Sequence, residues 1–187
     1  MTEESGPSYR GSILISNSTI ISDDFNKTVV FMIEHDSSGA FGLVINKKSE
    51  YSLHEVVVGV PENVAEEVPM YWGGPVDHSF ISILHNQSSF KDPGLEVIPG
   101  VYLSRSYELL ISLLENSESK FKVFHGYSGW GKMQLESEFE RKSWVEHKVN
   151  DKFILYRDTE EAWREALKSK GGIYKYFAEH TNDPLLN

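Results

Sequence analysis

The stretch HGYSGWGKMQLESEF, residues 125–139, combines a histidine, a serine, glycines and acidic side chains within a short span. Its Ser128 superficially resembles the serine of the G-x-S-x-G elbow, which presents a nucleophile in α/β-hydrolases. In that elbow one residue separates the serine from the second glycine, whereas Gly129 follows Ser128 directly. A hydrolase that combines Ser128 with His35 and Asp36 is one hypothesis, and it requires the three side chains within hydrogen-bond reach.

Metal and cofactor motifs are not found in this sequence. The chain has no cysteine, and its seven histidines form no compact pattern such as H-E-x-x-H, which places two imidazoles on one helix face. Distant strands could still bring His35, His85 and His125 together. A Walker loop is absent, and Gly39 with Gly42 is only a fragment of a dinucleotide fingerprint. We therefore predict neither a metal nor a cofactor.

The charge balance bears on the class of partner. Lys and Arg number 18 and Asp and Glu 28, which gives a net charge of −10. This excess of acid disfavours broad contact with a nucleic-acid backbone, which needs clustered Lys and Arg. The segment 157–175 is nearly balanced, so a small basic patch there is the alternative. We expect a protein or a small molecule as the partner, with direct nucleic-acid contact disfavoured.

Targeting signals and membrane spans are not predicted. Residues 1–10 are polar and lack the hydrophobic stretch of a secretory signal. No window approaches the ~18 uninterrupted apolar residues of a membrane-spanning helix. The lack of cysteine fits a reducing compartment. We expect a cytoplasmic location without membrane contact.

The elements that must position these residues follow from hydrophobic periodicity. Alternating or β-branched apolar runs predict strands at 11–16, 28–34, 41–46, 69–74, 79–85, within 92–104, at 120–125 and at 142–149. Capping residues followed by apolar positions at helical spacing predict helices at 52–60, 106–117 and 159–170. Strands grouped mainly as hairpins, with helices between the groups, indicate an α+β fold.

No repeat, low-complexity segment or linker divides the chain. A length of 187 residues is sufficient for one domain with a sizeable core. We expect a flexible tail at 1–10, one compact domain at 11–178 and a frayed tail at 179–187. The acidic segment QLESEFER, residues 134–141, fits either a helix or an extended strand.

The glycines have a structural and a functional interpretation. Glycines at 126, 129 and 131 would let the chain leave the strand 120–125 in a tight turn, with Trp130 packed in the core below. Alternatively, Gly73–Gly74 and the later glycines could bring bare backbone amides to a shallow cleft with aromatic walls. The first interpretation is favoured.

Four motifs occur in order along the chain. They are GSILIS, F-x-x-T-V-V-F-M-I-E-H-D-x-x-G-A-F-G-L-V-I-N, WGGPV and GYSGWGKMQLESEF-x-x-x-S-W. Together they span residues 11–156 and resemble the bacterial YqgE/AlgH family. The resemblance implies an α+β fold with a strand-rich, partly barrel-like core. It also implies no defining reaction and a proposed role in regulating transcription during alginate production. Where the family often has alanine, this chain has Ser128, which argues against a nucleophile there.

Positions within these motifs define the candidate binding surface. Its residues are His35, Asn46, Gly73, Gly74, Pro75, Gly126, Tyr127, Gly129, Trp130 and Gln134. The favoured hypothesis is a binding or regulatory module that uses this surface. A hydrolase that uses His35, Asp36 and Ser128 is the alternative, and a nucleic-acid-binding transcriptional regulator is the second alternative.

Overall fold

The computed structural model describes residues 8–17, 23–60, 68–116, 118–157 and 159–180. In this part of the chain the strands are β1 (Ile13–Ser16), β2 (Val29–Asp36), β3 (Gly39–Val44), β4 (Met70–Trp72), β5 (Val76–His85), β6 (Leu95–Ile98), β7 (Val101–Ser104), β8 (Phe121–Gly131) and β9 (Trp144–His147). The helices are α1 (Leu53–Val56), α3 (Tyr107–Glu115), α4 (Gln134–Glu140), α5 (Asp151–Tyr156), α6 (Thr159–Lys170) and α7 (Gly172–His180), with a short 3-10 helix η1 (Asp23–Phe25). Every predicted strand and helix is present, although several boundaries differ.

The strands form one sheet in the order β6-β7-β5-β8-β3-β2-β1-β9, and β4 pairs with β8 beside this path. The β4–β8 pair is parallel, and the other strand pairs are antiparallel. The predicted α+β class is therefore confirmed. The path is open at β6 and β9, so the core is strand-rich, as the resemblance implied, but is not closed into a barrel.

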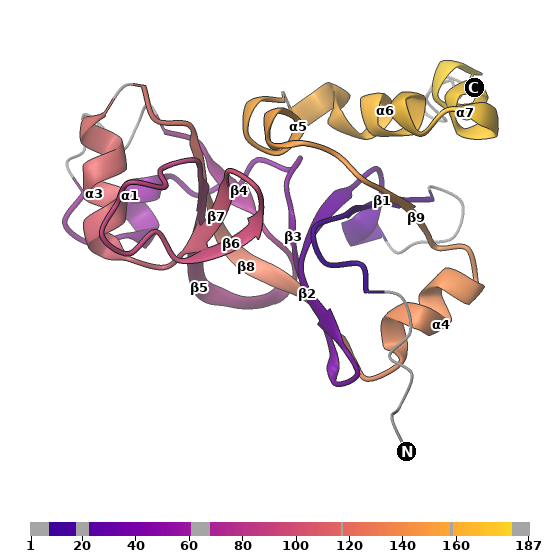
Figure 1. Cartoon of the computed structure of the whole chain (residues 1–187), viewed down its shortest axis with the longest axis horizontal. Coiled ribbons are helices and arrows are strands. Elements are labelled where there is room, and N and C mark those ends of the chain that lie inside the picture. The colour runs from indigo at the N-terminus through magenta and orange to yellow at the C-terminus, as the bar shows by residue number, and fades with distance from the viewer. Residues whose placement is uncertain (1–7, 18–22, 61–67, 117, 158, 181–187) are drawn as a thin grey trace.

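Strand β8 joins the two halves of the sheet (Figure 1). Its first part pairs with β5 on one edge and with β4 on the other, and its last part pairs with β3. The predicted tight turn after residue 125 is therefore wrong, because the strand continues to Gly131. Among the glycines at 126, 129 and 131, Gly126 has a positive φ of 68°, whereas the other two have no positive φ.

The glycines allow two backbone segments to cross at very short range. A Cβ added to Gly73 would lie 2.3 Å from the carbonyl oxygen of Gly126. One added to Gly74 would lie 2.3 Å from the backbone of Tyr127, and one added to Gly126 would lie 2.5 Å from the oxygen of Gly74. Real Cβ atoms do not approach other atoms this closely, so only glycine fits at these positions. We call this contact the glycine crossing.

Side chains alternate between two faces of the sheet and meet different helices. Ile13 and Ile15 of β1 belong to a buried cluster with α5 and α6, including Trp163. Leu14, between them, belongs to a cluster on the other face with Trp130, beside α4. Figure 1 shows α4 and the α5–α7 segment on opposite sides of this part of the sheet, with α1 and α3 at the far end. Trp130 is 7% exposed, so its predicted place in the core is confirmed.

The structure contains more helical segments than the sequence predicted. The open choice at 134–141 is decided in favour of a helix, α4, and the helices α5 and α7 were not predicted. Gly171, at φ 78°, ends α6 as expected, but α7 begins at the next residue. Within the described ranges no helix is long and apolar enough to cross a bilayer.

The ends of the described chain extend the packed structure beyond its predicted limits. Tyr9 lies within the expected tail 1–10, yet its ring stacks on Phe139 at 4.3 Å and on His35 at 5.1 Å between centroids. At the other end α7 includes residues 179 and 180. Residues 1–7 and 181–187 of the two expected tails lie outside the described residues.

We predict that Gly126→Ala lowers the free energy of unfolding by about 3 kcal/mol or more, because the strain of about 1–2 kcal/mol at positive φ adds to the clash with Gly74. Gly171→Ala is the matched control, since that glycine also has positive φ but no atom within 4 Å of an added Cβ. The Gly171→Ala variant should lose only the free energy of the backbone strain at positive φ. Urea unfolding of both variants measures the difference, and equal losses would show that the glycine crossing is not tightly packed.

Candidate functional site

The residues predicted for the binding surface lie at the glycine crossing, in the core and around α4. Gly73, Gly74, Gly126 and Tyr127 do meet, at the glycine crossing. Their backbone groups are already used: the Gly73 N–H donates to the His125 carbonyl, and the Gly73 carbonyl accepts from the Val44 N–H. The expected cleft with free glycine amides is therefore not present at Gly73.

Asn46 is buried, whereas Pro75 is exposed. Asn46 is buried, and its amide group accepts from the Val29 N–H at 2.7 Å and donates to the Lys27 carbonyl at 2.9 Å. The Asn46 side chain thus fastens the start of β2. Pro75 is exposed beside the glycine crossing, and Gly129 is exposed on β8.

His35, Trp130 and Gln134 gather instead around α4. The His35 Nδ1 accepts from the Tyr9 N–H at 3.2 Å, and therefore its Nε2 carries the proton and donates to Glu136 at 3.0 Å. Gln134 donates to Glu138 at 3.1 Å. The side chains that looked most suited to chemistry here are engaged in holding α4 and the chain's first described residues to the sheet.

Glu138 of α4 holds two tryptophan side chains in this region. One of its oxygens, Oε2, accepts from the indole N–H of Trp130 at 2.9 Å and from that of Trp144 at 2.7 Å. Both indoles are buried, and a buried N–H without a partner costs free energy. One carboxylate therefore fixes two strands, β8 and β9, to α4.

The hydrolase hypothesis built on Ser128 is not supported. Ser128 is completely buried, and its hydroxyl donates to the Gly73 carbonyl at 3.1 Å. His35 contacts Glu136, and the Asp36 carboxylate accepts from the hydroxyl and the N–H of Ser38. Each of the three residues has a separate partner, so they form no nucleophile–base–acid chain.

The three histidines considered for a metal are also separate. His85 accepts from the Gln87 N–H and donates to the Pro93 carbonyl, whereas His125 bonds to Ser49. Within the described residues no group of three His, Cys, Asp or Glu side chains could hold a metal ion.

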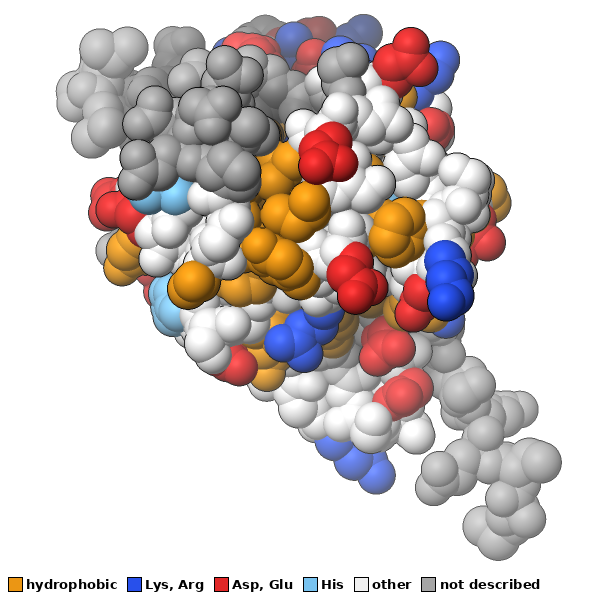
Figure 2. Space-filling view, turned by 90° about the vertical axis from the view of Figure 1, so that its left-hand side faces the viewer, with side chains coloured by type: hydrophobic (Ala, Val, Ile, Leu, Met, Phe, Trp, Pro, Cys, Tyr) orange, Lys and Arg blue, Asp and Glu red, His pale blue; other side chains and the backbone are white. Residues whose placement is uncertain are grey.

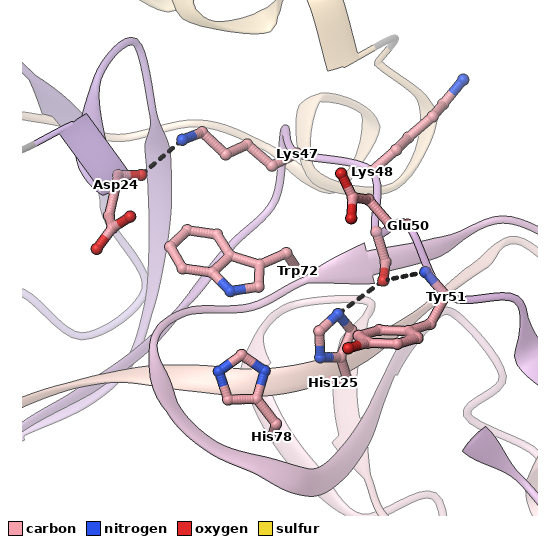
Figure 3. Close-up of a pocket in the computed structure, with 9 residues that line it drawn as sticks. Asp24, Lys47, Lys48, Glu50, Tyr51, Trp72, His78 and His125 are labelled. Atoms are coloured by element: carbon pink, nitrogen blue, oxygen red, sulfur yellow. Dashed lines mark hydrogen bonds between the residues drawn. The ribbon is translucent and has the colours of Figure 1, made fainter. Parts of the chain in front are cut away.

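A pocket lies beside the glycine crossing, at the residues that precede each glycine motif. Trp72 ends β4 just before Gly73, and His125 of β8 is its register partner just before Gly126. The pocket has a volume of about 340 Å³ (Figure 3). It is lined by Asp24, Lys47, Lys48, Ser49, Glu50, Tyr51, Trp72, His78 and His125.

The segment that follows β3 forms one wall of this pocket and is held against β4. The Ser49 N–H donates to the Met70 carbonyl at 2.8 Å, and the Trp72 N–H donates to the Lys47 carbonyl at 2.9 Å. Lys48 forms a β-bridge with Tyr71 between these two bonds. The wall is thus fixed by backbone hydrogen bonds.

Lys47 and Trp72 form the upper part of the pocket in Figure 3. The Lys47 ammonium lies 5.3 Å from the centroid of the Trp72 ring, within cation–π range, and donates to the Asp24 carbonyl at 2.5 Å. Burial lowers the pKa of Lys47, and the nearby Asp24 partly opposes this. Trp72 is half-buried, so one part of its ring is available to a ligand.

Ser49 and His125 form the lower part of the pocket. The Ser49 Oγ lies 2.7 Å from the His125 Nε2 and also accepts from the Tyr51 N–H at 2.9 Å. The rings of Tyr51 and His78 lie 5.4 and 5.5 Å from the His125 ring. Burial first, and then the nearby His78, lowers the pKa of His125 below 6.5, so its imidazole is neutral at pH 7.

A second hollow, of about 270 Å³, lies at the α1–α3 end of the molecule. Figure 2 shows hydrophobic side chains gathered on this face. Val57 and Ile81 line the hollow, and its Arg105 is already engaged with the Ile81 carbonyl and lies over the Phe80 ring. The described residues that line this hollow include no histidine and no carboxylate, whereas both kinds of side chain line the pocket at His125.

A family model described as AlgH-like, DUF179, matches residues 13–175. The chain belongs to the AlgH-like family. A UPF0301 protein of Chlorobaculum tepidum is 32% identical over 190 residues, which cover 100% of both chains. Another, of Cytophaga hutchinsonii, is 32% identical over 183 residues, 95% of this chain and 98% of that protein. The family resemblance of the four motifs is thereby confirmed.

Solved structures of two other proteins have a similar fold. The solution structure of the AlgH protein from Pseudomonas aeruginosa matches with a TM-score of 0.77 and 25% identity, covering 98% of this chain and 100% of AlgH. A protein of Corynebacterium diphtheriae matches with a TM-score of 0.73 and 17% identity over 92% of each chain, which shows the fold alone. Because one fold supports many functions, the function of this AlgH-like chain must be argued from its pocket.

We predict that Glu138→Ala in this AlgH-like chain lowers the free energy of unfolding by about 2–6 kcal/mol, because two buried indole N–H groups each lose their acceptor at about 1–3 kcal/mol. Glu140→Ala, an exposed position on the same helix, should change it by less than about 0.5 kcal/mol. Thermal and urea unfolding compare the two variants. A similar small change in both would mean that Glu138 does not hold the two tryptophans.

We predict that the His125 imidazole titrates with a midpoint below 6.5, because burial disfavours its charged form. The unfolded chain then takes up this proton at a higher pH than the folded chain does. The stability from neutral His125 is fully present above pH 6.5 and is lost as pH falls through the lowered folded pKa. NMR titration of labelled imidazoles measures the midpoint.

The pH dependence of unfolding provides the control for this titration. Burial also lowers the pKa values of His85 and His147, so they contribute to the same loss of stability in acid. His125→Asn should remove only part of the stability difference between pH 7 and pH 5. A midpoint at or above 6.5, or an unchanged difference in the variant, would contradict the prediction.

Proposed function

We propose that this chain is a binding module for a small organic ligand that occupies the pocket between Trp72 and His125. The ligand has a flat ring, which stacks on Trp72, and an anionic group, which accepts hydrogen bonds from Lys47. The observation that carries the proposal is the pairing of a half-buried indole and an ammonium group on one wall of a pocket of about 340 Å³. That volume lies near the lower end of the usual range for small-molecule sites.

The hydrogen-bonding capacity of Lys47 supports an anionic group on the ligand. An ammonium has three N–H donors, and one of them goes to the Asp24 carbonyl. A carboxylate or phosphate group would meet the remaining donors at the same end of the pocket as the Trp72 ring. Glu50 lies on the same wall, so a ligand with a single anionic group fits better than one with several.

The direct nucleic-acid alternative has less support. The candidate basic segment 157–175 begins at Arg157, which lines a hollow of about 730 Å³ together with Lys148 and Lys152. Arg157 is paired with Glu165 at 3.1 Å, and the net charge of −10 disfavours contact with a phosphate backbone. A regulatory role of this module would then pass through its ligand or a protein partner, and we propose the cytoplasm as its location.

The four tryptophans make the proposal testable. Trp130, Trp144 and Trp163 are 5–7% exposed and donate their indole N–H groups to protein acceptors. Trp72 is half-buried on the pocket wall. An NMR screen of aromatic carboxylates and phosphates should therefore move the Trp72 indole resonance and leave the other three in place.

We predict that Lys47→Gln weakens binding of such a fragment at least about tenfold, since one charge-assisted hydrogen bond is worth about 1.5–3 kcal/mol. Lys91→Gln, at an exposed lysine outside the pocket lining, is the matched control and should leave the affinity unchanged. Titration of the Trp72 indole resonance gives both affinities. A screen in which no fragment moves this resonance would overturn the proposed function.

A further inference from the structure

The contact between Ser49 and His125 has the geometry of a nucleophile and its base. The Ser49 Oγ and the His125 Nε2 are 2.7 Å apart, within the range at which a base takes a hydroxyl proton. The Tyr51 N–H donates to the same Oγ at 2.9 Å and so occupies one of its lone pairs. The hydroxyl oxygen is thus held within hydrogen-bond distance of the imidazole nitrogen.

The position of Ser49 differs from that of Ser128. Ser128 is fully buried and donates to a backbone carbonyl, so it cannot meet a substrate. Ser49 is half-buried and lines the pocket, where a ligand can reach it. The contact between Ser49 and His125 lies on the side of the pocket where Figure 3 shows His78 and Tyr51 beside His125. A reacting group bound below Trp72 would therefore lie beside this serine.

The residue after Ser49 offers a donor for a developing negative charge. Among the described residues, the N–H of Glu50 donates to no protein acceptor. In serine hydrolases the N–H of the residue after the nucleophile is one of the oxyanion-hole donors.

We propose that Ser49 is a nucleophile activated by His125, and that the pocket hydrolyses small carboxylic esters. This inference rests on the proposed ligand pocket and adds a reaction to it. It places the imidazole proton on Nδ1, which leaves Nε2 as the acceptor. The reaction class is acyl transfer to water.

The steps balance without any cofactor. As the Ser49 Oγ bonds to the ester carbonyl carbon, its proton passes to the His125 Nε2. The bond from that carbon to the alcohol oxygen then breaks, and His125 returns the proton to the leaving oxygen. A water molecule next gives a proton to His125 and attacks the acyl carbon. The carboxylic acid is released as Ser49 Oγ takes that proton back.

The first experiment finds the reacting atom in the unmodified protein. The full chain is incubated with diisopropyl fluorophosphate, in which the serine oxygen displaces fluoride from phosphorus, and peptides are mapped by mass spectrometry. Label on Ser49 supports the inference. Label on other serines, or none, overturns it. This measurement needs no variant and therefore does not depend on the folding of one.

The second experiment measures turnover of p-nitrophenyl acetate. Ser49→Ala and His125→Gln should each lower the rate at least about 100-fold, the usual contribution of a positioned base and its nucleophile. Ser38→Ala is the matched control, because the Ser38 hydroxyl donates to a carboxylate on the exposed β2–β3 turn, and it should keep full activity. Equal rates in all four proteins would overturn the inference.

The two proposals fail in different ways. If aromatic fragments move the Trp72 resonance but Ser49 takes no label, the pocket binds ligands and the reaction is ruled out. If Ser49 is labelled and the fragments leave Trp72 unmoved, the reaction stands and the aromatic anion is the wrong ligand class. If neither occurs, both proposals fall.

Discussion

The close contact between two backbone segments, Gly73–Gly74 and Gly126–Ser128, is the constraint on which the rest of the structure depends. At this contact carbonyl oxygens occupy the space that any Cβ would need. Because the segments can approach so closely, β4 runs parallel to one end of β8 while β3 pairs with the other end on the same edge. Strand β8 can then belong to both halves of the sheet. The pocket lies beside this contact because the residues before each glycine motif, Trp72 and His125, are brought together in register.

Several residues that look functional in the sequence are needed for internal hydrogen bonding. Asn46 holds the start of β2, Ser128 bonds the Gly73 carbonyl, and Glu138 accepts from two indoles. Buried polar groups need hydrogen-bond partners, so many polar side chains of this sheet form hydrogen bonds within the protein that stabilise the fold. The residues left for function are half-buried ones at the edge of the core, where a hydrogen bond is formed but solvent and ligand still have access. Ser49 and Trp72 are of this kind.

The charged and titratable side chains of the pocket also favour a functional site there. The chain carries a net charge of −10, and one pocket combines two lysines and two histidines with Asp24 and Glu50. Burial lowers the pKa values of Lys47 and His125, and a shifted pKa beside a cavity is a common property of functional sites. The fold shared with AlgH from Pseudomonas aeruginosa places the chain in a family but assigns no ligand to the pocket.

The sequence by itself determined the strands, the helices at 52–60, 106–117 and 159–170, the α+β class and the family. Hydrophobic periodicity and capping residues act over a few neighbouring positions, so they can be recognised without the tertiary structure. The sequence failed where tertiary contacts decide between local alternatives. The glycines at 126, 129 and 131 are equally consistent with a tight turn and with a strand that another backbone segment crosses. Only the position of the partner segment Gly73–Gly74 distinguishes these two structures. The short helix α5 has too few turns for a clear periodic signal.

The site shows the same division. The sequence revealed the glycine motifs. However, the predicted binding surface included the glycines and the residues after them, and it left out Trp72 and His125, which precede them. Ser49 gave no local signal, since its partner His125 lies 76 residues further along the chain. Neighbours in sequence can reveal which residues bend or pack. The hydrogen bond that makes a serine reactive depends on strand register across the sheet, and only the tertiary structure determines that register.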